Sequence, residues 1–373
     1  MISVIIPIYK GNKYIKSQIK QIESAAKKCS EQIEVLFIND FPNEPMDKNE
    51  KSDVVGIRYV EMGCHKGIHG ARIYGIEKSA GEDILMLDQD DEIYCDYFRI
   101  QLQGMENADA SVCASIEGDR EYYIGERSID KIDDPEIFLG WGNTIISPGQ
   151  VLIKRDAISE VWLNNPMSNN GADDWLLWIC LFKSGRTIIK KKNILFRHNL
   201  HSDNTSSHNI EMGLSGQEMI SVIAREQVLD VNEFERLSNT VLRIGRWRLS
   251  IAINTEKKVR LLSELIKRKH FGVSIFALLK RDSVKKLAIY GAGEIGQIIH
   301  YILEDEGYDV VSFIDRNADS LHQGVKAFLP EEYDFCVDAV IISLISDEEE
   351  AEEVIGALSS VRTYRISDIM FSM

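Results

Sequence analysis

Three carboxylates follow a short apolar run in residues 83–91, where Asp88, Asp90 and Asp91 come directly after residues 84–87. Four consecutive apolar residues are typical of a strand buried on both faces, and ligands of open α/β sheets bind at the carboxyl ends of strands. Because side chains alternate along a strand, Asp88 and Asp90 point the same way and could share one Mg²⁺ or Mn²⁺ with substrate phosphates. An EF-hand loop is disfavoured because Ile93 stands where such a loop needs glycine. The remaining alternative is a strand that ends in a solvated acidic turn.

The segments around this run alternate between strand-like and helical patterns, which is typical of a doubly wound α/β fold with a mostly parallel sheet. Polar residues end three of the predicted strands: Tyr9, the pair Asn39 and Asp40, and the acidic run. Since the carboxyl ends of parallel strands share one edge of a sheet, we expect these side chains to form one site. We predict strands at 2–8, 33–38, 54–61 and 83–87, and helices after residue 12 and at 71–80.

The composition is that of a water-soluble globular protein, with 44% apolar and 27% charged residues. A length of 373 residues predicts at least two domains, and a net charge of −16 argues against nucleic-acid binding. No apolar run approaches the roughly 20 residues that span a bilayer, and the strand-like start does not resemble a signal peptide. The six cysteines form no C-x-x-C pair, so we expect free thiols in a cytoplasmic protein.

Six ordered motifs in the first 210 residues resemble those of the family 2 glycosyltransferases, which have the GT-A fold. The motifs are residues 3–9, 38–40, 67–72, 87–91, 172–175 and 197–206. The chain departs from the family at Asn39, where the family commonly has a first aspartate, and at Asp173, where it commonly has glutamate. The resemblance implies a GT-A catalytic domain at 1–208, and the residue patterns after it predict a helical linker at 209–284 and a Rossmann-like domain at 285–373.

The resemblance also implies roles for the residues at the predicted sheet edge. Glycosyl transfer from a nucleotide diphospho-sugar needs a cation at the leaving diphosphate, and Asp90, supported by Asp88, is the predicted ligand of Mn²⁺ or Mg²⁺. Arg72 and His201 are expected to contact the diphosphate, because each can donate hydrogen bonds to phosphate oxygens. The full set of predicted donor-binding residues is Pro7, Tyr9, Asn39, Asp40, Arg72, Asp88 and His201.

Asp174, with its neighbour Asp173, is the predicted catalytic pair. An acceptor hydroxyl needs a carboxylate within hydrogen-bond reach, and such a base contributes roughly 10²–10⁴ in rate. Both residues also suit the first turn of the apolar helix that follows, where they would cap it, and only their place in the family pattern favours catalysis. A base opposite the leaving group implies inversion at the anomeric carbon. Trp141, between glycines, is a candidate to contact the acceptor.

The predicted linker is helical and becomes basic at 257–286. This segment contains ten Lys or Arg residues and only two acidic residues, Glu264 and Asp282. The interleaved apolar residues could make an amphipathic helix that lies on an anionic membrane, which would suit a lipid-linked acceptor. The alternative is a solvated helix that packs on the domains. The apolar residues are Val259, Leu262, Ile266, Phe271, Ile275 and Leu278.

A dinucleotide-binding fingerprint begins the last domain. Gly291, Gly293 and Gly296 form G-x-G-x-x-G after a strand, and Asp315 follows about 20 residues later, where a ribose hydroxyl would bind. The domain has room for one mononucleotide half and offers no hydride chemistry. We interpret it as a regulatory or assembly module that could bind a nucleotide or dinucleotide, with an empty fold as the alternative.

The sequence therefore predicts a metal-dependent inverting hexosyltransferase. Its donor would be a nucleotide sugar, with UDP the expected base, and its acceptor a glycan or lipid-linked glycan of a cell-surface polysaccharide. A nucleotidyltransferase acting on sugar phosphates is one alternative, and a non-catalytic nucleotide sensor that works through the C-terminal domain is another.

Overall fold

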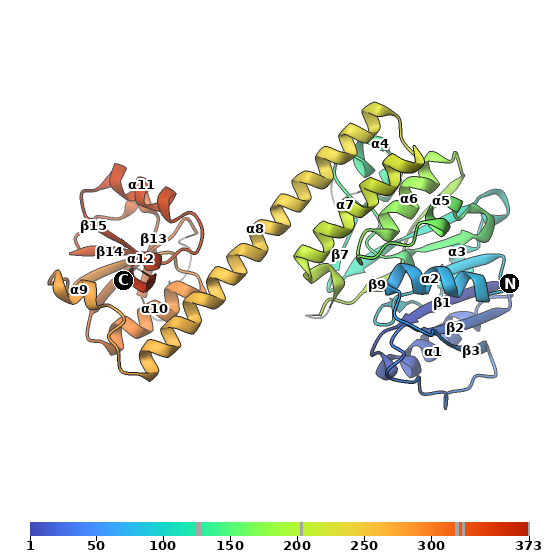
Figure 1. The fold of residues 1–373 in the computed structure, drawn as a ribbon, viewed down its shortest axis with the longest axis horizontal. Helices are drawn as coiled ribbons and strands as arrows, with labels where there is room; N and C mark the ends of the chain where they lie inside the picture. Colours follow the sequence, from blue (N-terminus) through green and yellow to red (C-terminus); the bar gives the residue numbers. More distant parts are fainter. Residues whose placement is uncertain (124–127, 202–203, 318–320, 323–324, 372–373) are drawn as a thin grey trace. The chain divides into compact units, whose positions relative to one another are not determined.

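The structure is a computed structural model that describes residues 1–123, 128–201, 204–317, 321–322 and 325–371. The chain forms two compact units, residues 1–249 and 250–373, and the division falls inside the long helix α8 (Val231–His270). The predicted linker segment contains α7 (Asn209–Glu226), α8 and α9 (Ala277–Arg281), so it is helical as expected. Figure 1 shows the order of the elements.

The first unit is built on a sheet with the strand order β3-β2-β1-β4-β8-β6-β9-β5, with β7 paired to β6, among the described residues. The strands β3, β2, β1 and β4 are parallel, as are β6 and β9, whereas β8 runs antiparallel to both of its neighbours. The bounds are β1 (Ile2–Ile8), β2 (Ile33–Asn39), β3 (Gly56–Glu61), β4 (Asp83–Met86), β5 (Glu92–Ile93), β6 (Ala110–Glu117), β7 (Arg120–Glu121), β8 (Val151–Lys154) and β9 (Ile188–His198).

Helices cover both faces of this sheet, because the strands are apolar on both sides. Val4 and Ile6 of β1 pack in one apolar cluster with α1 and α3, and Ile5 between them packs in the other with α2, α5, α6, α7 and the start of α8. This two-sided core explains the continuous apolar runs of β1 and β4. The helix bounds are α1 (Asn12–Ala26), α2 (Gly67–Lys78), α3 (Tyr97–Gln101), α4 (Pro135–Phe138), α5 (Glu160–Asn164) and α6 (Asp173–Lys183).

The second unit has its own sheet in the order β12-β13-β11-β10-β14-β15, of which all but the short β12 are parallel among the described residues. The predicted α/β class, with a large mostly parallel sheet and a second, smaller parallel sheet, is therefore confirmed. The bounds are β10 (Lys286–Tyr290), α10 (Glu294–Asp305), β11 (Asp309–Ile314), β12 (Leu321–His322), β13 (Val325–Phe328), β14 (Ala339–Ile342), α11 (Glu348–Leu358), β15 (Arg362–Arg365) and α12 (Ile366–Phe371).

The apolar residues of segment 257–286 do not form one exposed face. Ile275 is buried in the core of the second unit, and Leu262 and Leu278 pack against that core. The other three, Val259, Ile266 and Phe271, are exposed. Several cations of the segment are paired with carboxylates, such as Lys258 with Glu294, Lys269 with Asp305 and Arg268 with Glu264. The predicted amphipathic surface is therefore smaller and less basic than the sequence suggests. No helix in the described ranges has the length and apolar character to cross a membrane.

Candidate active site

The carboxyl ends of β1, β2 and β4 meet at one edge of the sheet of the first unit. Leu87 donates a backbone hydrogen bond to Ile5 (3.0 Å), and Asp40 donates one to Ile8 (2.9 Å), so the parallel pairing extends to the strand ends. Pro7 lies within β1 opposite Ile38, beyond the last residue of β1 that pairs with β4. A proline there costs no ladder hydrogen bond to β4. The pairing brings Tyr9, Asp40 and the acidic loop 88–91 to the same edge.

Gln18 of α1 fixes the backbone of the acidic loop. Its side-chain nitrogen donates to the carbonyl oxygens of Gln89 and Asp91 (both 2.8 Å) and lies 3.4 Å from that of Asp88. Gln18 is buried although it is polar, on the face of α1 that otherwise carries isoleucines. A buried amide needs partners, and the loop carbonyls satisfy it. Gln18 was not predicted as a site residue. The available signal was a polar residue among the apolar residues that line one face of the predicted helix.

Asp91 belongs to a buried network. Its carboxylate accepts hydrogen bonds from Ser147 Oγ (2.9 Å) and the backbone N–H of Asn199 (3.1 Å), and it lies 2.9 Å from Nδ1 of His198. Burial raises the pKa of Asp91 to about 6, with the charge and hydrogen bond of His198 opposing the shift. Burial by itself would lower the pKa of His198. The hydrogen bond and the charge of Asp91 outweigh the effect of burial, and the pKa of His198 is raised to about 9. The pair ties the acidic loop to the end of β9, so Asp91 has a structural role.

Asp90 and His201 meet at the edge of this network. Asp90 Oδ2 contacts Nε2 of His201, and both side chains are partly exposed. A carboxylate and an imidazole are ligands that Mn²⁺ accepts, and hard divalent cations are commonly held by one or two protein groups with substrate phosphates completing the shell. The two residues therefore fit a cation. In the described part of the chain no set of three or more Asp, Glu, His or Cys residues is arranged around a metal position. Residues 202 and 203 of the predicted motif lie outside the described residues.

Arg72 joins the acidic loop to α6. Its guanidinium donates to Asp88 Oδ1 (2.5 Å) and to Asp173 Oδ2 (2.6 Å), and Arg72 is only 3% exposed. Burial lowers the pKa of Arg72, but the two carboxylates outweigh it and the net shift is upward. The same charge holds the pKa of Asp173 below its usual range despite burial. Asp88 and Asp90 therefore have different side-chain partners within the protein.

Asp174 is the next residue of α6, and it has no cation as a direct partner among the described contacts. Asn143 Nδ2 donates to Asp174 Oδ2 (3.0 Å), and the backbone N–H of Trp175 donates to Oδ1 (2.7 Å). Burial, and then the negative charge of Asp173, raise the pKa of Asp174 to about 8. A carboxylate with a pKa near neutrality is suited to accept a proton. Asn143 is a second residue that sequence reasoning missed, and its position two residues after Trp141 was the available signal.

Tyr9, Phe41 and His65 form an aromatic cluster at the carboxyl ends of β1 and β2. The ring of Tyr9 packs against Phe41 and His65, with centroids 5.1 Å apart in both pairs. Gln89 bonds to the backbone of Tyr9, which connects this group to the acidic loop. Tyr9 is 43% exposed, so its ring is accessible to a planar ligand. His65 was not predicted, and it comes from the loop before α2.

Asn39 and Asp40 are buried behind this aromatic group. Asn39 donates to Glu61 Oε2 (2.6 Å) and to the carbonyl of Glu44 (2.9 Å), so its amide nitrogen holds the loop after β2. Asp40 accepts a hydrogen bond from the backbone N–H of Lys66 (2.7 Å) and lies 2.8 Å from His65 Nδ1. Burial raises the pKa of Asp40, against these opposing contacts. Both residues lie at the predicted edge, and their side chains mainly order its loops.

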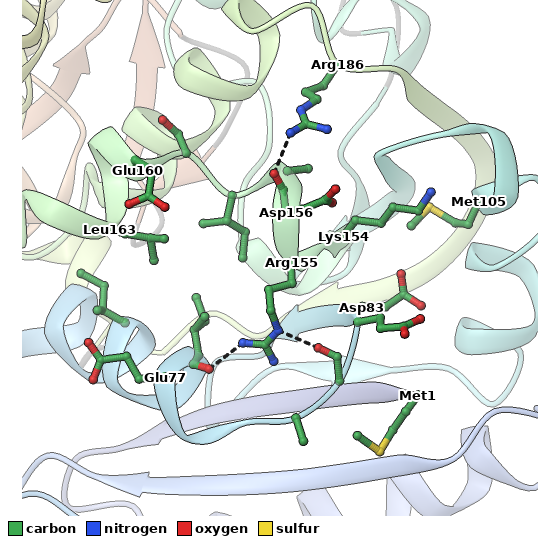
Figure 2. Close-up of a pocket in the computed structure, with 18 of the residues that line it drawn as sticks. Met1, Glu77, Asp83, Met105, Lys154, Arg155, Asp156, Glu160, Leu163 and Arg186 are labelled. Carbon is green, nitrogen blue, oxygen red and sulfur yellow. Dashed lines mark hydrogen bonds between the residues drawn. The ribbon is translucent and has the colours of Figure 1, made fainter.

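A broad cavity of about 1560 Å³ lies at the opposite end of β4 from Asp88 (Figure 2). Asp83, at the start of β4, lines it together with Lys154 and Arg155. Arg155 donates hydrogen bonds to the backbone carbonyl oxygens of Gly81 (2.8 Å) and Ile76 (2.7 Å), so its guanidinium group already has partners within the protein. The cavity contains none of the predicted site residues.

The glycine turn of the second unit connects the strand β10 to the helix α10, as the sequence predicts. An added Cβ on Gly296 would lie 1.9 Å from the carbonyl oxygen of Gly291, whereas Gly293 has open space around it. Asp315 accepts hydrogen bonds from the backbone N–H groups of Ala292 (2.7 Å) and Asn317 (2.9 Å). The carboxylate predicted to bind a ribose therefore binds the turn itself.

The fold and this edge define an α/β protein whose acidic loop lies at the carboxyl ends of parallel strands. Residues 3–162 match the family model described as glycosyl transferase family 2. The N-terminal part of the chain is therefore similar to this family. The predicted resemblance is thus confirmed.

Curated relatives and solved structures give further similarities. An uncharacterized glycosyltransferase of Rickettsia bellii (strain RML369-C) is 35% identical over 111 residues, which cover 28% of this chain and 15% of that protein. One of Rickettsia felis (strain ATCC VR-1525 / URRWXCal2) is 24% identical over 251 residues, 62% of this chain and 40% of that protein. The chain thus spans less than half the length of these two relatives.

Among solved structures, S. aureus TarS 1-349 in complex with UDP-GlcNAc has 12% identity and a TM-score of 0.48, over 64% of this chain and 71% of that chain. The mannosyltransferase PcManGT from Pyrobaculum calidifontis, in complex with GDP-Man and Mn²⁺, has 13% identity and a TM-score of 0.41, over 67% of this chain and 74% of that chain.

Proposed function

We propose that this protein is a metal-dependent inverting glycosyltransferase. It transfers a hexose from a nucleotide-diphosphate donor, with UDP as the expected nucleotide, to a glycan or lipid-linked acceptor of a cell-surface polysaccharide. The observation that carries the proposal is the Arg72 bridge, which holds the acidic loop beside α6, so that Asp174 lies one residue from a carboxylate joined to that loop. The match of residues 3–162 to the family model described as glycosyl transferase family 2 supports the same reaction class.

Asp174 is the proposed general base. Its pKa of about 8 means that roughly one tenth of the carboxyl groups are ionised at pH 7 and that the ionised form is basic enough to accept the proton of an acceptor hydroxyl. Asn143 and the N–H of Trp175 hold the carboxylate in place. Attack from the side of Asp174, opposite the leaving diphosphate, inverts the anomeric centre.

Asp90 and His201 are the proposed protein ligands of Mn²⁺ or Mg²⁺. A divalent cation at this position would act as a Lewis acid that neutralises the leaving diphosphate. The side chains of both residues are partly exposed, which leaves room for phosphate oxygens. Asp88 is proposed to support the donor from the same loop, while its bond to Arg72 keeps it in place.

Arg72 is proposed as a positioning residue that acts through Asp88 and Asp173. A guanidinium that is 3% exposed and already binds two carboxylates would have to release one of them to reach a diphosphate. Its charge also opposes the upward shift in the pKa of Asp174. This role replaces the direct diphosphate contact expected from the sequence.

Tyr9, with Phe41 and His65 around it, is the proposed platform for the donor base. Its accessible ring offers the flat apolar face on which a base stacks. Asp40 is close enough to His65 to orient that ring. A stacking platform tolerates several bases, so the choice of UDP rests on the family resemblance.

Thermal-shift measurements with a panel of nucleotide sugars test the proposal. We expect one donor to raise the melting temperature in the presence of Mn²⁺, and Asp90→Ala to abolish the shift while leaving the melting temperature of the free protein nearly unchanged. Asp119→Ala, at a fully exposed carboxylate, is the control. Stabilisation that needs no metal, or that survives Asp90→Ala, would contradict the metal assignment.

A further inference from the structure

A groove of about 690 Å³ lies between the first turns of α8 and the segment that follows α4, within the first unit. Trp141 and Gly140 form one wall, and Asn232, Glu235, Asn239 and Arg243 of α8 contribute to the other. None of these residues belongs to the donor side of the site described above.

The backbone beside Trp141 is fixed from two directions. Thr240 Oγ1 and Arg243 Nη2 each donate to the carbonyl oxygen of Gly140 (3.0 Å), which ties the segment to α8. Asn143 donates to Asp174 (3.0 Å), which ties the other end to the proposed base. Gly142 between them has a φ of +137°, a conformation that favours glycine. A rigid four-residue segment therefore connects the groove to Asp174.

Trp141 is 57% exposed in spite of this fixed backbone. Trp162, Trp175 and Trp178 are buried, and the other exposed tryptophan, Trp247, does not line the groove. Single exposed aromatic residues are common and do not make a site by themselves. The polar side chains around Trp141 and the link to Asp174 distinguish it from Trp247.

The chemistry of the groove selects among possible occupants. Trp141 is the single large apolar side chain among its described lining residues, so an acyl chain or an apolar helix would find little to pack against. Two glutamates and two arginines balance in charge, and Glu136 pairs with Arg236, which gives no preference for a polyanion or a polycation. Amide and guanidinium groups beside an indole can pair with hydroxyls while the ring covers a sugar face.

We propose that this groove is a subsite for the acceptor glycan, in which Trp141 stacks on a pyranose ring and Asn232, Asn239 and Arg243 bond to its hydroxyls. The sugar that is bound there is distinct from the one attacked, because Asn143 and its neighbours separate the groove from Asp174. The inference rests on the proposed function, since it names the acceptor of that same site as an oligosaccharide rather than a single sugar.

A glycan array of bacterial surface oligosaccharides, probed with the full-length protein, tests the subsite. We expect the wild-type protein to bind at least one oligosaccharide, Trp141→Ala to weaken that binding at least tenfold in a follow-up titration, and Trp141→Phe to keep it within about threefold because an aromatic face remains. Trp247→Ala is the matched control and should bind like the wild-type protein.

Two outcomes would overturn the subsite: no oligosaccharide on the array binds the wild-type protein, or Trp141→Ala binds as well as the wild-type protein. The donor is measured in parallel by metal-dependent thermal shift with the nucleotide sugar. An unchanged donor shift in Trp141→Ala, with glycan binding lost, supports the subsite. Glycan binding without any donor shift in the wild-type protein would instead overturn the proposed function, and with it the assignment of the glycan as an acceptor.

Discussion

The acidic loop after β4 and the glycine turn after β10 each follow a buried parallel strand, but their charged side chains have different partners. Asp88 and Asp90 contact Arg72 and His201, which come from other parts of the first unit. Asp315, which follows β11, instead accepts hydrogen bonds from the backbone N–H groups of Ala292 in the glycine turn and of Asn317. The difference shows that side chains from distant elements assemble the candidate site of the first unit, whereas the carboxylate of the fingerprint in the second unit binds backbone N–H groups.

The substitution Asp174→Asn is expected to have the largest effect on the first of these regions. Removal of the proposed base should lower kcat by about 10²–10⁴, because no side chain then takes the proton from the hydroxyl of the acceptor substrate. Binding of the donor should be retained. Transfer to an acceptor glycan and thermal shift by the donor measure the two effects separately. Asp119→Asn is the control, and full activity in Asp174→Asn would favour a nucleotidyltransferase.

Arg72→Met should destabilise the protein by about 3–5 kcal/mol, because it leaves the buried Asp173 and the partly exposed Asp88 without their cation. Arg99→Met is a matched control, since Arg99 pairs with Asp96 at the surface and should contribute less than about 1 kcal/mol. Chemical denaturation of both variants measures the difference. Equal losses in the two variants would mean that the bridge does not hold the loop to α6.

The pH dependence of catalysis should follow the ionisation of Asp174. Because the base must be ionised, kcat/KM for the acceptor should fall about tenfold per pH unit below about 8, the pKa of Asp174. A pH profile with Mg²⁺ measures this, and a rate that stays constant down to pH 5 would contradict the role of Asp174.

Stability should depend on the same carboxyl group with the opposite trend. Its pKa is higher in the folded protein than in the unfolded chain, so the folded state binds more protons between about pH 4 and 8, and the free energy of unfolding falls as pH rises through this range. Asp174→Asn removes this dependence, so its stability relative to the wild-type protein should increase from pH 5 to pH 8. A constant difference in denaturation experiments would argue against the raised pKa.

The smallest effects are expected in the glycine turn, where two glycines have different surroundings. Gly296→Ala should destabilise the second unit by about 1–3 kcal/mol, because its Cβ would collide with the backbone of Gly291. Gly293→Ala meets no atom within 4 Å and should change stability by less than about 0.5 kcal/mol. Hydrogen exchange of the β10 amides measures both.

NAD⁺ titration of the same two variants tests the predicted fingerprint. If the turn holds a pyrophosphate, Gly293→Ala should weaken binding although the fold is intact, because the added methyl group lies where the ligand approaches. If NAD⁺ does not bind the wild-type protein, the carboxylate of Asp315 on Ala292 N–H accounts for it, and the glycines serve packing alone.

The sequence by itself determined the first four strands, the helices between them and the loops at their ends, because apolar runs and their spacing are local properties. It also determined the family motifs, since their residues lie close together in the chain. Tyr9, Asp40 and the acidic loop could be assigned to one edge because parallel strands must align their carboxyl ends.

Only the tertiary structure decided what the charged groups do. Arg72 could not be recognised as a bridge between Asp88 and Asp173, because Asp173 lies 101 residues away in the chain. The pKa of Asp174 depends on its burial beside Asp173, and burial is a property of the packed core. His201 reaches Asp90 across 111 residues, and Asn143 reaches Asp174 across 31. Charges act over distances in space, so the sequence names the groups of the site and the fold decides their partners.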